Sequence, residues 1–64
     1  MEFSKEELLE ARRQIGSILH KLEETIKTLE AKENPERYKS QLTPAKRRVK
    51  ALHIADTLIS RELA

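Results

Sequence analysis

The fold is decided by residues 31–36, Ala-Lys-Glu-Asn-Pro-Glu, which separate two long segments with apolar residues at helical spacing. Asn34 can accept a hydrogen bond at a helix N-cap, and Pro35 has the backbone angle that suits the first helical position. Glu36 then places a carboxylate in the first turn, where the helix dipole favours negative charge. The stretch therefore predicts that one helix has ended and that a second begins at Pro35, with the chain reversing at Asn34.

The first segment begins with three signals for the start of a helix. Ser4 followed by Glu7 forms a capping box, and Phe3 is placed to pack on Leu8 as a hydrophobic staple. Apolar residues then recur every three or four positions, with one basic interruption, which predicts a helix over residues 4–33. The members of this apolar stripe are Leu8, Ile15, Leu19, Leu22, Ile26 and Leu29.

The second segment keeps the same spacing through a proline, Pro44. An internal proline removes a backbone hydrogen bond and clashes with the carbonyl four residues earlier, so a break at residues 40–43 is one alternative. The apolar spacing crosses position 44 without a change of phase, and this favours a single helix over residues 35–63, bent at Pro44. Its stripe consists of Tyr38, Leu42, Ala45, Val49, Leu52, Asp56, Ile59 and Leu63, with Asp56 as the one charged member.

Two helices of similar length joined by one turn predict an all-α fold, an antiparallel helical hairpin that forms a single domain over residues 1–64. Facing residues in such a hairpin have numbers that add to a constant, and the two stripes obey this rule. In that alignment the only charged residues of the stripes, Arg12 and Asp56, face each other. We therefore predict an intrachain ion pair between them, which sets the register of the helices. The predicted flanking pairs are Glu30 with Lys39 and Glu23 with Lys46.

The second segment is apolar over a wider arc than one partner helix can cover. We expect the surplus to drive self-association into a two-fold dimer, a four-helix bundle with coiled-coil-like packing. A helix of another protein docking in the same place is the alternative. Gly16 either marks the close approach of another backbone or is tolerated in its helix. The predicted interface residues are Ala11, Ile18, Ala51, Ile54, Ala55 and Leu58.

A basic stretch in the second segment offers a different function. Four cations within five residues attract phosphate backbones, so an accessory nucleic-acid-binding protein is the alternative reading. The cations fan around the helix, and no aromatic stacking pair or glycine-rich phosphate loop accompanies them, which favours a solvated helix face. The candidate phosphate contacts are Lys46, Arg47, Arg48 and Lys50.

Composition excludes several classes of function. The 64 residues include no cysteine, which excludes disulfides and thiolate zinc sites, and the one Phe and one Tyr leave little surface for stacking on bases. His20 and His53 are not brought together by the hairpin, so we expect no metal, no cofactor and no catalysis. The first residues lack a secretory signal, and no apolar run is long enough to cross a bilayer. We expect a cytoplasmic protein-interaction or adaptor module.

One group of residues in the second segment carries a resemblance: Thr43, Ala45-Lys46-Arg47-Arg48, Lys50-Ala51-Leu52, Ile54-Ala55 and Leu58-Ile59. Together they resemble the second half of a set of very short bacterial proteins of unknown function that look like helical hairpins. The resemblance covers most of the chain and implies the fold, but it implies no activity, ligand or catalytic residue. Pro44 departs from the helix-forming or apolar residue of that pattern, which puts the straightness of the second helix in doubt.

Overall fold

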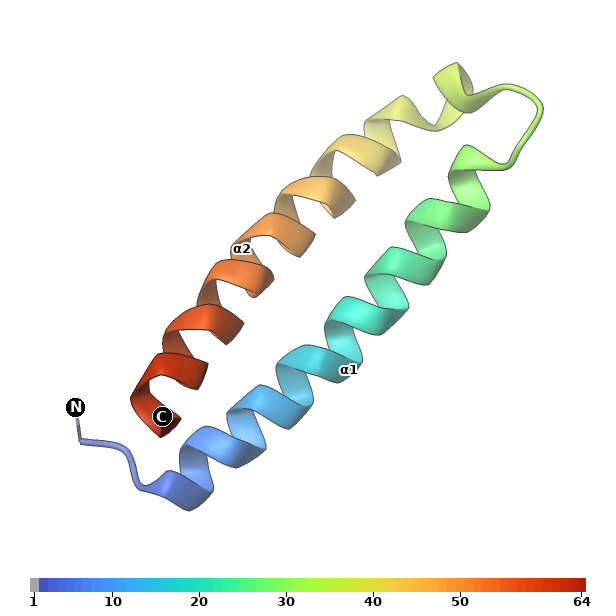
Figure 1. Ribbon diagram of the computed structural model, residues 1–64. Helices are drawn as coiled ribbons and strands as arrows, with labels where there is room; N and C mark the ends of the chain where they lie inside the picture. Colours follow the sequence, from blue (N-terminus) through green and yellow to red (C-terminus); the bar gives the residue numbers. More distant parts are fainter. Residues whose placement is uncertain (1) are drawn as a thin grey trace.

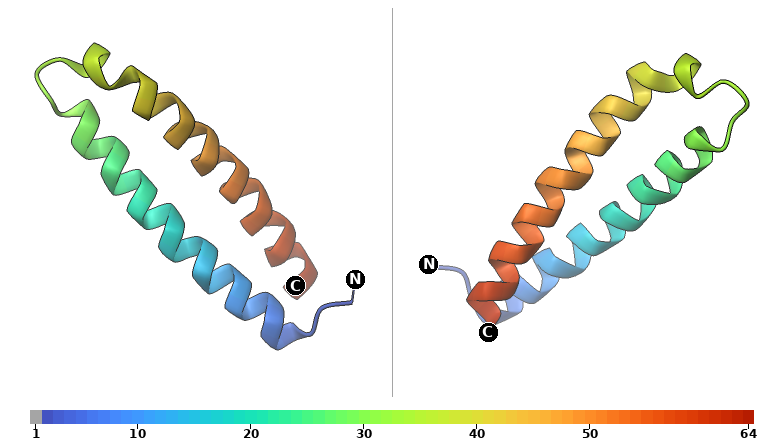
Figure 2. Two further views of the ribbon diagram at one scale, coloured as in Figure 1. Left: turned by 180° about the vertical axis from the view of Figure 1, so that it is seen from behind. Right: turned by 45° about the horizontal axis from the view of Figure 1, so that its top comes forward.

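Two antiparallel helices lie side by side and are joined by a short turn (Figure 1). The computed structural model describes residues 2–64, and this part of the chain contains no strand. Helix α1 spans Lys5–Glu30, a 3-10 helix η1 spans Pro35–Tyr38, and helix α2 spans Lys39–Leu63. The two views of Figure 2 show that the helices stay adjacent over their length, with both chain ends at one end of the hairpin. The predicted all-α hairpin is confirmed.

The start of α1 forms as predicted, whereas its end comes earlier. The Glu7 N–H donates to the Ser4 hydroxyl oxygen at 3.1 Å, and the Ser4 N–H donates to the Glu7 carboxylate at 3.0 Å, which completes the capping box. The helix ends at Glu30 and not at residue 33. The N–H groups of Ala31 and Lys32 turn back to carbonyls of the last helical turn, as in a tightened helix end.

The turn delivers the chain into a 3-10 helix before α2 begins. Pro35 is the first residue of η1, as predicted for a second helical segment, and Asn34 occupies its N-cap. The Asn34 carbonyl accepts a hydrogen bond from the Arg37 N–H at 3.0 Å, while the Asn34 side chain makes no capping bond. The α-helical geometry therefore starts only at Lys39, four residues later than the sequence pattern suggests.

Helix α2 is continuous through Pro44, so the alternative of a break at residues 40–43 is wrong. Pro44 lies five residues after the first residue of α2, so the hydrogen bond that its missing N–H removes is the one to the Ser40 carbonyl, near the start of the helix. The bend at Pro44 stays a prediction.

The core is a narrow seam between the helices. Four side chains are buried: Leu8 and Leu19 from α1, and Leu42 and Ala45 from α2. Among the described residues no side chain is completely buried, so each layer of the seam remains partly open to water. Neither helix is long and apolar enough to span a membrane. The half-buried remainder of the predicted stripes comprises Ile15, Leu22, Ile26, Leu29, Tyr38, Val49, Leu52, Ile59 and Leu63.

Candidate interaction surface

One side of the hairpin carries two polar contacts between the helices. The Lys46 Nζ atom lies 2.9 Å from the Glu30 Oε2 atom, and the His53 Nε2 atom lies 3.7 Å from the Glu23 Oε2 atom. Glu23 precedes Glu30 by seven residues and His53 follows Lys46 by seven, so the two contacts repeat along the same side. We call these four residues the polar flank.

The contacts observed on the polar flank differ from the flanking pairs predicted from the sequence. Each carboxylate has a partner on α2, but Glu30 contacts Lys46 where Lys39 was expected, and Glu23 contacts His53 where Lys46 was expected. Helical side chains lean toward the N-terminus of their own helix. In an antiparallel pair the side chains of the two helices therefore lean toward each other along the hairpin. A long side chain of α1 then meets an α2 residue that lies nearer the open end of the hairpin than the α2 residue directly opposite.

The predicted ion pair between Arg12 and Asp56 is not formed. No N···O distance of 4.0 Å or less joins the charged groups of these two residues, although both lie in the described part of the chain. Arg12 is exposed and Asp56 is half-buried, so neither charge is removed from water. The long guanidinium side chain reaches solvent beside the seam, which avoids the desolvation that a buried pair would require. The pair therefore cannot set the register as predicted.

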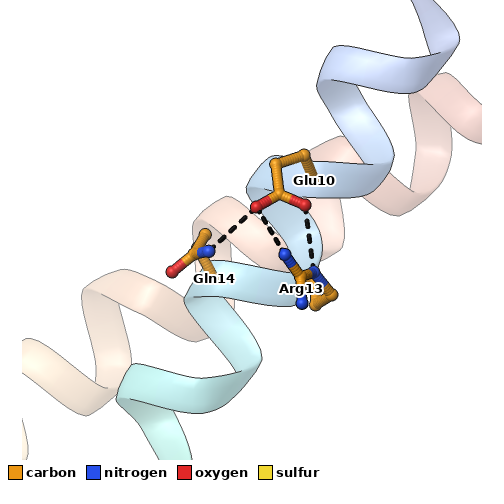
Figure 3. Close-up of polar contacts among 3 residues, drawn as sticks. All are labelled: Glu10, Arg13 and Gln14. Carbon is orange, nitrogen blue, oxygen red and sulfur yellow. Dashed lines mark hydrogen bonds and ion pairs between the residues drawn. The ribbon is translucent and has the colours of Figure 1, made fainter.

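A second polar cluster lies within α1 alone. The Arg13 side chain donates to both carboxylate oxygens of Glu10, at 3.0 and 2.8 Å, and the Gln14 amide donates to the same carboxylate at 2.9 Å. These hydrogen bonds, that from Arg13 first, lower the pKa of Glu10. Figure 3 shows the three side chains on α1, with α2 behind that helix. The cluster supports one helix and encloses no pocket.

Large apolar side chains are exposed on the side of the hairpin opposite the polar flank and on the outer face of α2. Ile18 is 46% exposed, Ile54 is 54% exposed and Leu58 is 52% exposed. At about 100° per residue, Ala55 lies about 200° around α2 from His53, which places it on the side away from Glu23. The apolar surface defined by these positions consists of Ala11, Ile18, Ala51, Ile54, Ala55 and Leu58, the residues predicted from the sequence.

The apolar surface continues from the side of the hairpin onto the outer face of α2. Ile54 and Leu58 line a shallow hollow on this helix together with His53 of the polar flank and three further polar or basic residues. Within the six-residue set, Ala11 and Ala55 are half-buried beside the seam, whereas Ala51 is exposed. Ala11 and Ala55 therefore border the core, and the exposed residues of the surface lie farther out.

The sequence pattern did not indicate a hollow at the open end of the hairpin. Phe3, Leu8, Ala11 and Ile59 line it, together with Glu7. Phe3 was expected only as a staple on Leu8, and the structure leaves it 59% exposed. Amphipathic spacing cannot place this residue, because it precedes the helix and no periodicity governs it.

The basic stretch is divided among different sides of α2. Lys46 belongs to the polar flank, where it contacts Glu30. Arg47, Arg48 and Lys50 are exposed, and at about 100° per residue they point to three different directions. The structure therefore does not gather the four candidate phosphate contacts onto one face.

Residues 2–64 hold no group of three His, Cys, Asp or Glu side chains placed to hold a metal ion. His53 lies beside Glu23, and the exposed His20 lies on α1. A comparison with known protein families, curated proteins and solved structures finds no match for this chain.

Proposed function

We propose that this protein is a non-catalytic interaction module of the cytoplasm that associates with a second copy through its apolar surface. The observation that carries the proposal is the exposure of Ile18 on the side opposite the polar flank and of Ile54 and Leu58 toward the outer face of α2. Large apolar side chains gathered on one side of a small protein are typical of an association surface. A second hairpin would cover them and form a four-helix bundle.

The small core supports the same proposal. Only four side chains of the described chain are buried, and a chain of 64 residues has little apolar surface to bury within itself. Small domains without disulfides or a structural metal commonly gain stability by oligomerisation. The chain has no cysteine and so no disulfide to stabilise it, and association would add buried surface.

The experiment is a native mass measurement by light scattering on the wild type and on three variants. Ile18→Glu and Leu58→Glu place a carboxylate on the apolar surface, and we expect both to shift a dimeric wild type to the monomer. Leu9→Glu is the matched control, because Leu9 is 47% exposed, nearly the same as Ile18, but lies on the polar-flank side. This variant is expected to remain dimeric.

Three results would overturn or redirect the proposal. A wild type that is monomeric at every concentration tested rejects self-association. Variants Ile18→Glu and Leu58→Glu that remain dimeric reject the apolar surface. A high-mass wild-type species that dissociates steeply as salt rises and carries co-purified nucleic acid supports the phosphate-binding alternative, since an apolar interface holds or tightens under the same conditions.

A further inference from the structure

We propose that the second copy docks about a two-fold axis that passes beside Ala55 of α2 and midway between Ala11 and Ile18 of α1. In this arrangement each Arg48 faces the second copy's Glu62. The inference rests on the proposed self-association and adds the register in which the two copies meet. It predicts which residues become neighbours, and it follows from the order of side chains on the apolar side of both helices.

The residues of α2 are arranged almost symmetrically about Ala55, to within one position. Ala51 precedes it by four positions and Leu58 follows by three, while Arg48 precedes and Glu62 follows by seven. All five project from one side of the helix, within an arc of about 80° at 100° per residue. When two α2 helices cross this axis antiparallel, each small Ala51 meets a large Leu58, which lets the layers interdigitate.

The charges at the edges of this contact are complementary. Arg48 is basic and Glu62 is acidic, and both are exposed. Neither takes part in an ion pair within the part of the chain that the structure describes. Because the axis exchanges the two positions, one contact between the helices contains this pair twice. Opposite charges at the rim of an interface favour one register over others.

The pairing of small residues with large ones about the axis also holds on α1. Ala11 and Ile18 lie seven residues apart on the side that faces away from the polar flank. In an antiparallel contact of two α1 helices centred midway between them, each Ala11 meets an Ile18 of the second copy. A small residue again faces a large one, as in the contact of the two α2 helices.

Both contacts can form at once only if their centres lie at the same level along the hairpin. Leu8 lines one hollow with Ile59 and another with Leu63, so it lies level with about residue 61 of α2. Six residues farther along α1 and six back along α2, both at the same rise per residue, residue 14 is level with about residue 55. One axis therefore serves both helices.

Docking through the outer face of α2 alone is less favourable. An antiparallel contact centred on Ile54 and Leu58 would bring Lys50 within one residue of the level of the second copy's Arg61 and on the same edge of the contact, and these two residues line the same hollow as the apolar pair. Like charges that face each other across a contact disfavour that pairing. In the proposed register Ile54 lies at the edge of the interface, and the basic residues remain in solvent.

The first test exchanges charges between copies. Arg48→Glu alone and Glu62→Arg alone each replace two attractive contacts with two repulsive ones, so each variant is expected to dimerise about tenfold more weakly. An equimolar mixture of the two variants restores both attractive contacts in a heterodimer. Native mass spectrometry should show the heterodimer as the dominant dimer. A statistical mixture of the three dimers rejects the register.

The second test uses single cysteines, which report cleanly because the chain has none. Ala55→Cys places a thiol beside the axis in both copies, and we expect mild oxidation to form a disulfide-linked dimer. Ala51→Cys is the matched control, because its two copies would lie about 12 Å apart along the helices, beyond the span of a disulfide. Cross-linking of Ala51→Cys in place of Ala55→Cys contradicts the proposed axis.

The experiments distinguish a dimer with a different register from a protein that does not self-associate. A wild type that is dimeric by light scattering, with no preference for the Arg48→Glu and Glu62→Arg heterodimer, keeps the proposed function and rejects the axis. A monomeric wild type rejects both.

Discussion

The polar contacts between Glu30 and Lys46 and between Glu23 and His53 are the residue-scale features that join the helices. All four side chains are about half exposed, so each contact contributes little energy. The contact with His53 is an ion pair only when the imidazole is protonated. These contacts help to define how α1 and α2 align, because a single alignment of the two helices forms both of them.

Double-mutant cycles distinguish the Glu30–Lys46 contact, which the structure forms, from the predicted Arg12–Asp56 ion pair, which it does not form. Replacing Glu30 and Lys46 with alanine, singly and together, is expected to give a coupling free energy of roughly 0.2–1 kcal/mol in urea unfolding. The same cycle on Arg12 and Asp56 is expected to be additive, since no contact joins them. The reverse ranking of the two cycles would contradict the observed pairing. Both cycles require one fixed chain concentration.

At the scale of elements, the parts that sequence could predict are those determined locally. Ser4 and Glu7 lie three residues apart and complete a capping box whatever the rest of the chain does. The end of α1 at Glu30 could not be predicted, because no glycine or proline follows at once, and Ala31 satisfies the last carbonyls through backbone bonds. The partner of Glu30 could not be predicted either, since it depends on how side chains lean across two helices.

Gly16 provides a prediction for α1. A Cβ atom added there meets nothing within 4 Å, and the residue does not have a positive φ. Gly16→Ala is therefore expected to raise the free energy of unfolding by about 1 kcal/mol, the difference in helix propensity. Ser17→Ala, at an exposed neighbouring position, is the control and should give a smaller gain. A loss of stability in Gly16→Ala would place a second backbone against the polar-flank side.

At the scale of the whole molecule, the candidate surface was predictable and its energetic role was not. Ile18, Ile54 and Leu58 could be assigned to the outside because periodicity gives the direction of a side chain. Periodicity does not predict how many side chains of the seam become buried. Only four side chains of the described chain are buried, so the hairpin has a thin core for its length.

The thin core predicts that stability depends on chain concentration. If the folded unit is the dimer, the Tm measured by circular dichroism should rise as the wild type is concentrated, because association draws the equilibrium toward the folded state. The Leu58→Glu variant should unfold at a lower Tm that is independent of concentration. A wild-type Tm that stays constant over a hundredfold range of concentration would show that one hairpin is stable without a partner.

The elongated shape of the hairpin has a hydrodynamic consequence. The described chain extends over 46 Å in one direction and only 15 and 14 Å in the others. Two such rods laid flank to flank double in thickness at nearly constant length, whereas rods joined end to end double in length. Small-angle scattering therefore distinguishes the two assemblies by the maximum dimension alone, and a lateral dimer should have a lower frictional ratio than its own subunit.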